Sequence, residues 1–309
     1  MEKDYIVAIG VACVDEYYTM DHWIPEGEKG NVCFVESRIG GMIPNAACVL
    51  AGYGEKTYMI TALNDQEVSK AVRSDLEKWN LDLSCAVIDK RFPDAKCMII
   101  KTPAERTIFV SDTSTIRYPV DKKRYNLLKG AKCIYTSMME FHRLEDREEL
   151  AKDLAESGVK IVFDLETSTF DTYQDPLFDY ASILIFNEEG WKKFCGKRQE
   201  KECMDSLLKG RTEVVMITLG AEGCYGRTKT EEIRIPGNKV AVVDTTGAGD
   251  TFNGSFVFSW LSGKPLKYCA EFANAAGAYA VTVQGARGGI ASYEETEKRM
   301  KEFSKERQL

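Results

Sequence analysis

Several residue types and motifs that mark common functions are scarce in this sequence. It contains only two histidines, His22 and His142, which leaves little for imidazole-based metal binding or for a catalytic triad. Its ten cysteines are scattered, and none belongs to a Cys-x-x-Cys motif. We therefore expect reduced thiols in a protein core rather than disulfides or a zinc site.

Features of membrane proteins and nucleic-acid-binding proteins are also missing. No apolar run is long enough to cross a bilayer, and residues 1–4 lead into the apolar segment 5–9 without a basic stretch or a cleavage site. The net charge of −7 and the isoelectric point near 5.2 argue against a nucleic-acid or membrane partner. We expect a cytoplasmic protein whose 309 residues form one large α/β domain or two smaller ones.

The clearest chemical signal lies in residues 243–254, which read VDTTGAGDTFNG. The apolar residues 240–243 predict a strand, and the spacing of later aromatic residues predicts a helix that starts near the glycines. Gly247, Ala248 and Gly249 are small enough for consecutive backbone N–H groups to converge at the positive end of that helix. Such a turn can bind an anion.

Asp250 follows in the first turn of the predicted helix. A carboxylate there can accept the proton of a nucleophile that attacks a phosphoryl group, although a helix cap is the plainer alternative. Other phosphate-binding motifs fit worse. The segment from Gly190 to Lys197 has one residue too many for a Walker loop, and Phe252 stands where a dinucleotide fingerprint needs a small residue.

Residues 243–254 resemble the signature of the ribokinase family, the phosphofructokinase-B-type carbohydrate kinases, and the resemblance extends roughly from Ile6 to Ala291. It implies an α/β fold with a ribokinase-like, doubly wound, mostly parallel sheet, helices on both of its faces and a small β-sheet lid. It also implies ATP and Mg²⁺ as cofactors, together with a monovalent cation such as K⁺ in many members. We expect a single kinase domain over residues 1–309.

A second motif supports the resemblance and suggests a sugar site. Gly40, Gly41 and Asn45 match the Gly-Gly-x-x-x-Asn pattern of the family. The glycines permit close approach of the backbone to a ligand, and an Asn side chain can both donate to and accept from hydroxyls. Asp15 follows the predicted first strand, residues 5–10. The family resemblance implies that it binds sugar hydroxyls, although it could be a turn residue.

The lid is expected from residues 15–39 and 96–118. Residues 31–39 carry apolar side chains on both faces of a predicted strand, and Arg106 begins the second strand of a predicted hairpin. By resemblance Arg106 is a candidate substrate contact, with a surface ion pair as an equal alternative. One face over a sugar cannot bury all of these apolar groups, so we expect a homodimer formed through the lids.

In the second half of the chain, predicted strands alternate with predicted helices, which indicates a parallel sheet covered on both faces. Glu140 follows one of these strands and matches a sugar-contacting acid of some relatives, or is a plain loop carboxylate. Asn187 matches the start of the Asn-x-x-Glu motif that orders magnesium and phosphates in the family, but Gly190 replaces its Glu. Either Glu189 takes over the metal after a local shift, or metal handling relies on Asn187 and solvent.

The resemblance also implies a set of nucleotide and cation contacts. Thr218, Gly220 and Gly223 match the turn against which the adenosine lies, and Asn274 matches an adenine-facing position. Asp244, together with a later glycine-rich loop at residues 285–290, matches the monovalent-cation site.

We thus expect transfer of the ATP γ-phosphoryl group to a primary hydroxyl of a sugar of the ribose, fructose or ketodeoxygluconate type. Asp250 would be the base, and residues 247–249 would form the anion hole. One alternative is a nucleoside kinase of the same family, for which Phe34, Phe109 and Phe141 could form a base pocket. Another is a catalytically silent sugar-binding protein.

Overall fold

The central sheet has eight strands in this computed structural model, which describes residues 3–306, so the ends of the expected domain lie outside the described residues. In spatial order the strands are β14 (Glu232–Ile235), β13 (Cys224–Thr228), β12 (Val214–Thr218), β11 (Ile183–Asn187), β10 (Lys160–Leu165), β9 (Cys133–Thr136), β1 (Ile6–Ile9) and β4 (Thr57–Ile60). The neighbours from β12 to β4 are parallel, and β13 and β14 extend the sheet antiparallel. The expected doubly wound, mostly parallel sheet is confirmed.

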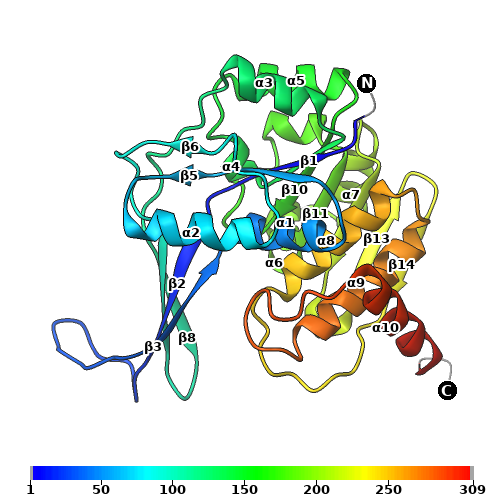
Figure 1. Cartoon of the computed structure of the whole chain (residues 1–309). Coiled ribbons are helices and arrows are strands. Elements are labelled where there is room, and N and C mark those ends of the chain that lie inside the picture. Colours follow the sequence, from blue (N-terminus) through cyan, green and yellow to red (C-terminus); the bar gives the residue numbers. More distant parts are fainter. Residues whose placement is uncertain (1–2, 307–309) are drawn as a thin grey trace.

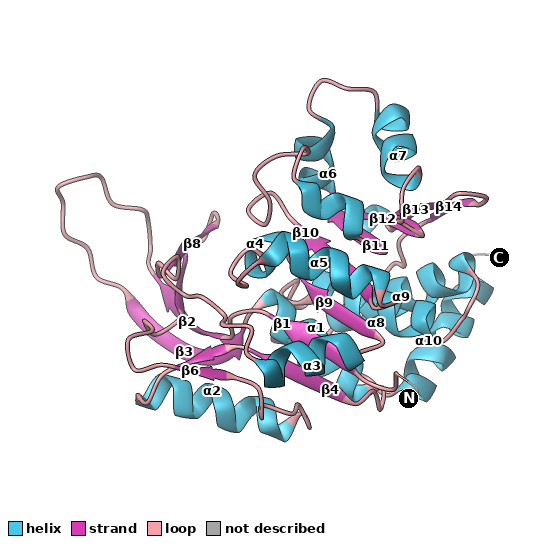
Figure 2. Cartoon of the chain, turned by 90° about the horizontal axis from the view of Figure 1, so that it is seen from above, coloured by secondary structure: helices cyan, strands magenta, loops and turns pink. Residues whose placement is uncertain are grey.

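Two separate cores cover the two faces of this sheet, because successive side chains of a strand point to opposite sides. In β1, Val7 and Ile9 pack in one core, and Ile6 and Ala8 pack in the other. The first core is covered by α3 (Lys122–Gly130), α4 (Met138–Phe141), α5 (Arg147–Glu156), α6 (Glu188–Cys195) and α7 (Glu200–Leu208), and the second by α1 (Met42–Gly52), α2 (Glu67–Lys78), α8 (Ala248–Leu261) and α9 (Leu266–Ala280). Figure 1 and Figure 2 show the two helical layers, with α10 (Tyr293–Glu306) packed beside α9. Because both faces are buried, the strands read as continuous apolar runs.

A second sheet of four strands projects from one side of this body (Figure 1). Its order is β3 (Cys33–Gly40), β2 (Cys13–Thr19), β7 (Lys96–Lys101) and β8 (Arg106–Val110). The lid hairpin of β7 and β8 was predicted from the sequence and is present. The remaining elements are the short pair β5 (Ala62–Leu63) and β6 (Val87–Ile88) and the 3₁₀ turns η1 (Pro176–Tyr180) and η2 (Gly220–Glu222).

The prediction of a strand at residues 240–243 is wrong. This segment has no regular structure, and Val242 and Val243 are 62% and 64% exposed. It is instead tied to the end of α9 through the N–H groups of Val243 and Asp244, which both donate to the carbonyl of Val281. Apolar composition alone does not separate a strand from an exposed loop. No helix among the described residues is long and apolar enough to cross a membrane.

Candidate active site

The glycine-rich turn at the start of α8 has the geometry that its sequence predicts. Gly247 is the N-cap residue, with a φ of 76°, and a Cβ atom there would lie 2.3 Å from the carbonyl oxygen of Ala286. The position therefore requires glycine on both conformational and steric grounds. Gly249 is different, because a Cβ atom there would meet nothing within 4 Å. The first turn of α8 thus opens onto free space on the side of Gly249, and the N–H of Ala248 makes only a long hydrogen bond, 3.4 Å, to the carbonyl of Thr245.

Asp250 is linked through polar contacts to residues from distant parts of the chain. The side-chain Nδ2 of Asn45 donates to Oδ2 of Asp250 at 2.7 Å, although 205 residues separate the two. Oδ1 of Asn45 in turn accepts from Nε of Arg287 at 2.8 Å, and the Arg287 guanidinium forms an ion pair with Asp75. The structure therefore brings the Gly-Gly-x-x-x-Asn motif together with the glycine-rich turn of α8, because Asn45 orients the Asp250 carboxylate directly.

The surroundings of Asp250 favour its neutral form. Burial raises its pKa well above the usual range of a carboxyl group, and the charges of Asp164 and Glu166 add to the rise. The hydrogen bond from Asn45 and the charge of Arg287 oppose it. A carboxylate whose pKa is raised is a stronger base than an ordinary Asp and therefore better suited to accept a proton.

Asp164, at the end of β10, forms a second buried carboxyl site behind the first turn of α8. It is only 2% exposed and accepts hydrogen bonds from the Tyr135 hydroxyl at 2.5 Å and from Nδ2 of Asn253 at 2.8 Å. Burial raises the pKa of Asp164 to about 7. Because Asn253 lies one turn after Asp250, this contact fixes the start of α8 against the sheet. The sequence predicted no role for Asp164.

Asp15, Gly40 and Gly41 lie together on the inner part of the lid. Asp15 is within β2 rather than at the end of the first strand, so its expected position is corrected. A Cβ atom on Gly40 would lie 2.2 Å from Oδ2 of Asp15, and a Cβ atom on Gly41, whose φ is 109°, would lie 2.8 Å from the carbonyl oxygen of Val11. The lack of a side chain at Gly40 leaves room for the Asp15 carboxylate, and the lack of one at Gly41 leaves room for the backbone of Val11.

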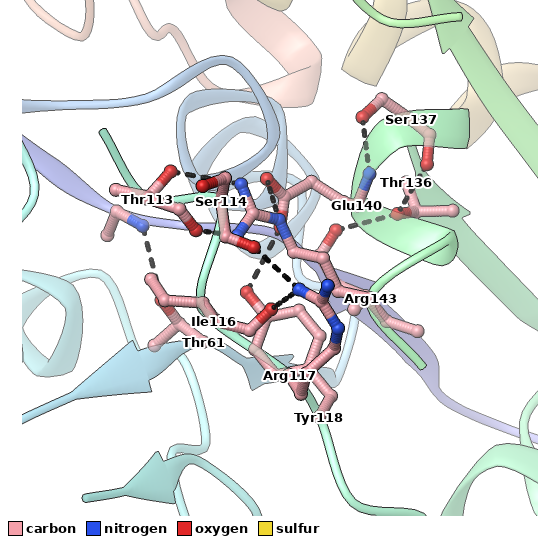
Figure 3. A network of polar contacts seen from close by, with 12 residues as sticks. Thr61, Thr113, Ser114, Ile116, Arg117, Tyr118, Thr136, Ser137, Glu140 and Arg143 are labelled. Atoms are coloured by element: carbon pink, nitrogen blue, oxygen red, sulfur yellow. Dashed lines mark hydrogen bonds and ion pairs between the residues drawn. The ribbon is translucent and has the colours of Figure 1, made fainter. Parts of the chain in front are cut away.

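Glu140 is engaged within the protein, as Figure 3 shows. It is 5% exposed, accepts from the Tyr118 hydroxyl at 3.0 Å, and lies 3.2 Å from Nε of Arg143 in an ion pair. Arg143 continues the network to the carbonyl and hydroxyl oxygens of Thr113. These contacts hold residues 113–118, which follow β8, against α4. They favour the structural alternative for Glu140, and its expected sugar contact stays a prediction. Arg106 is exposed on β8, and its role also stays a prediction.

The departure from the Asn-x-x-Glu motif has a steric cause. Oδ1 of Asn187 caps α6 by accepting from the N–H of Gly190 at 2.7 Å. A Cβ atom on Gly190 would lie 2.4 Å from the carbonyl oxygen of Leu165, so no larger residue fits without movement of the backbone. The Glu189 side chain is 69% exposed and forms an ion pair with Lys192, which does not favour it as the replacement for the missing acid, and its metal role stays a prediction.

Glu166 is a candidate that the sequence analysis missed. It directly follows β10, and its Cα lies 3.2 Å from the position that a Cβ atom of Gly190 would take. Its charge raises the pKa values of both Asp250 and Asp164, so its carboxylate is near enough to act on both groups. The signal that could have revealed it is a second acid two residues after Asp164. Arg287 was also missed, although it stands alone among small residues at 285–289.

The glycines of the expected nucleotide site shape a rigid pair of turns. Gly223 has a φ of 96°, and a Cβ atom there would lie 2.0 Å from the carbonyl oxygen of Ile235. Asn274 is 7% exposed, and its Nδ2 donates to the carbonyl of Pro236 at 2.7 Å. It therefore supports the turn after β14. Thr218 ends β12, and Gly220 begins η2 with a φ of 55°.

Asp244 joins two loops next to the anion-binding turn. Its Oδ1 accepts from the backbone N–H of Thr246 at 3.0 Å and from its hydroxyl at 2.7 Å, and its Oδ2 accepts from the N–H of Gly285 at 2.9 Å. Burial alone would raise the pKa of Asp244, but these hydrogen bonds outweigh it and lower the pKa. Both carboxylate oxygens thus hold backbone segments together.

Comparison with known proteins identifies the family of the chain and supports its fold. The family model described as pfkB family carbohydrate kinase matches residues 3–292. A ribokinase of Haemophilus influenzae is 25% identical over 94% of this chain and 96% of its own, and a 5-dehydro-2-deoxygluconokinase of Bacillus subtilis is 24% identical over 94% of each chain. The structure of Arabidopsis thaliana ribokinase complexed with ribose and ATP superposes with a TM-score of 0.85 at 21% identity, covering 97% of this chain and 99% of that one. A putative ribokinase II from E. coli in complex with ATP and Mg²⁺ gives a TM-score of 0.82 at 16% identity, over 97% and 99% of the two chains.

Proposed function

The chain belongs to the pfkB family of carbohydrate kinases, and from this premise we propose that it transfers the γ-phosphoryl group of ATP to a primary hydroxyl of a sugar of the ribose, fructose or ketodeoxygluconate type. One observation carries the proposal. The Asp250 carboxylate lies in the first turn of α8 beside the open glycine turn and is held by Asn45 from the Gly-Gly motif. A proton acceptor, an anion-binding helix end and a candidate sugar residue thus meet at one place.

In this mechanism Asp250 accepts the proton of the attacking hydroxyl. Burial raises the pKa of Asp250, which makes its carboxylate a stronger proton acceptor than an ordinary Asp, and Asn45 keeps the carboxylate in one orientation. The N–H groups at residues 247–249 stabilise the negative charge that develops on the transferred group. Removing one such donor in other enzymes costs ~10²–10³-fold in kcat.

Mg²⁺ would neutralise charge on the ATP phosphates. Glu189 is a poor candidate to hold it because it is exposed and paired with Lys192, and Gly190 has no side chain. Glu166 supplies a carboxylate at the same strand edge, next to Gly190. We assign the metal-ordering role to Glu166 with Asn187. Mn²⁺ binding in the presence of ATP, measured by electron paramagnetic resonance, should weaken in Glu166→Gln and stay unchanged in Glu189→Gln.

A monovalent cation such as K⁺ and a homodimer are further parts of the proposal. Asp244 supports the cation indirectly, since it fixes the two loops that would supply backbone carbonyl groups. The dimer is supported by the lid, on which Phe34 is 60% exposed and Val110 is 69% exposed. Apolar side chains this exposed on β3 and β8, the two edge strands of the lid sheet, favour association.

The substrate class is tested by an ADP-release assay with a panel of free sugars, keto-acid sugars and nucleosides. We expect turnover with a sugar and none with adenosine. Phe141 is buried in the core, so only Phe34 and Phe109 of the three expected aromatic residues could contact a nucleoside base. Preferential turnover of a nucleoside would replace the sugar assignment. Absence of kinase activity with every compound would favour a silent sugar-binding protein.

A further inference from the structure

Two thiols and a carboxylate, those of Cys13, Cys97 and Asp15, lie close together on one face of the lid sheet. Asp15 and Cys13 are two residues apart on β2, so their side chains are on the same face of the sheet. Cys97 is the register partner of Asp15 on the neighbouring strand β7 and shares that face. One ligand atom from each residue can be chosen so that all three lie within 4.8 Å of one another.

The separations within this group match those of a tetrahedral zinc site. Sγ of Cys13 lies 3.9 Å from Sγ of Cys97 and 3.4 Å from Oδ1 of Asp15. Tetrahedral zinc with Zn–S bonds of ~2.3 Å and a Zn–O bond of ~2.0 Å places its two sulfurs ~3.8 Å apart and each sulfur ~3.5 Å from the oxygen. The side chains therefore need little rearrangement to bind one ion.

Access to the group and the chemistry of its ligands also fit. All three residues are partly exposed, unlike the cysteines of the sheet body such as Cys48 and Cys133, which are buried. The residue opposite Cys13 on β3 is Gly40, which adds no side chain to this face. Two thiolates with one carboxylate suit Zn²⁺ much better than Mg²⁺, which prefers oxygen ligands only.

We propose that Cys13, Cys97 and Asp15 form a binding site for Zn²⁺ or a similar thiophilic divalent ion, with the fourth position open to solvent. Binding exchanges the two thiol protons for the metal and releases them to the buffer. This step rests on the proposed function: if Asp15 binds the sugar, as the family resemblance implies, the ion and the sugar compete for the same carboxylate. Zn²⁺ is then an inhibitor that raises the KM for sugar. This departs from the expectation of inert thiols, because residues 84 positions apart show no metal-binding spacing in the sequence.

The binding site is tested with Co²⁺, whose thiolate complexes absorb in the near ultraviolet, on the reduced full-length protein without nucleotide. Wild type and Cys33→Ser should both show the thiolate band, and Zn²⁺ should abolish it. Cys33 is the matched control, since it is an exposed lid thiol outside the group. Cys97→Ser should lose the band and bind Zn²⁺ more than ~10-fold more weakly. No band in wild type, or a band retained in Cys97→Ser, would overturn the proposal.

Kinase assays separate this site from the proposed function. Zn²⁺ should raise the sugar KM in wild type and in Cys33→Ser, and should have much less effect in Cys97→Ser, each compared with the KM of the same protein without Zn²⁺. A Co²⁺ band that the best sugar of the panel does not weaken would support the metal site while removing Asp15 from the sugar site. Cys97→Ser could lose the band only because it has unfolded, which circular dichroism would show. In that case Cys97→Ala and Cys13→Ser take its place, and each of these variants must also abolish the band.

Discussion

The central sheet and the lid differ in how completely they bury their side chains. All four residues of β1 are buried, whereas all five residues of β8 are exposed. The sheet holds its apolar side chains between two helical layers, and the lid leaves Phe34, Ile108 and Phe109 about half exposed or more. Because apolar burial is the main source of stability, the sheet determines whether the chain folds. The lid is free to respond to sugar, metal or a second subunit.

The candidate active site lies where these two regions meet. Asp250 and Asp164 belong to the body, and Asp15 belongs to the lid. Substitutions in the body should therefore change stability or the chemical step, and substitutions in the lid should change binding or assembly. Single and paired substitutions on either side of the junction can test that division.

The largest expected effect concerns the pH dependence of folding. The folded-state pKa of Asp164 is raised from 3.8 to about 7, so the folded protein holds a proton that the unfolded chain has lost. The contribution of Asp164 to stability is therefore greatest below pH ~4 and falls as pH rises to ~7. The fall is ~1.4 kcal/mol for each pH unit between the two pKa values, or roughly 4 kcal/mol in all. In Asp164→Asn this loss should disappear. Urea denaturation at pH 5 and at pH 7.5 would measure the difference in pH dependence between the two proteins.

Asn is tolerable at position 164 because its carbonyl can still accept from Tyr135. The hydrogen bonds from Tyr135 and from Nδ2 of Asn253 both end on Oδ2 of Asp164, so a carbonyl oxygen in that place can accept both. An equal pH dependence in wild type and variant would mean that Asp164 is ionised in the folded protein across this range.

The next largest effect is expected on the free energy of unfolding when the missing motif acid is restored at position 190. Gly190→Glu restores the family motif but places a Cβ atom 2.4 Å from the carbonyl oxygen of Leu165. Overpacking of this kind costs about 1–3 kcal/mol, and we expect the upper end of that range. Glu189→Gln is the control and should change the unfolding free energy by less than ~0.5 kcal/mol, since it is exposed. A Gly190→Glu protein as stable as wild type would show that the start of α6 and the end of β10 separate easily.

Smaller effects are expected on substrate affinity at the junction of body and lid. Asp15→Ala and Asn45→Ala should each raise the sugar KM ~5–100-fold, because a lost hydroxyl contact is worth about 1–3 kcal/mol when a partner is left unpaired. The ATP KM should change far less, and initial-rate kinetics with both substrates varied provide this internal control. Equal changes in the two KM values would remove these residues from the sugar site.

The smallest effect on stability is expected in the lid. Phe34→Glu combined with Phe109→Glu should change the free energy of unfolding by less than ~1 kcal/mol, because both side chains are largely solvated. The same variant should be monomeric by light scattering at micromolar concentration, whereas wild type should be dimeric. A monomeric wild type would contradict association through the lid.

The comparison of body and lid also explains what the sequence could reveal. The parallel strands were predictable because burial on both faces leaves a continuous apolar run, as in Ile6–Ile9. The start of α8 was predictable because Gly247, with a φ of 76°, has a local backbone requirement that glycine meets. Residues 240–243 show the limit of this reasoning, because an exposed loop can have the same composition as a strand.

Other parts of the site depend on contacts between distant segments. Arg287 reaches Asn45 across 242 residues, and Glu166 is placed next to Gly190 only by the pairing of β10 with β11. The loss of the motif acid was visible in the sequence, but its cause was not. That cause is the carbonyl of Leu165, which no local pattern reveals.

The central claim is that Asp250 is the base of a phosphoryl transfer at the start of α8. The most direct test compares the kcat and the ATP Kd of Asp250→Asn with those of wild type, using the best sugar of the panel. Asn has the shape of Asp and lacks the proton-accepting carboxylate, so we expect kcat to fall ~10²–10⁴-fold while ATP affinity and the unfolding curve stay close to wild type. Turnover near the wild-type rate in this variant would show that Asp250 only caps the helix, and the proposed mechanism would be wrong.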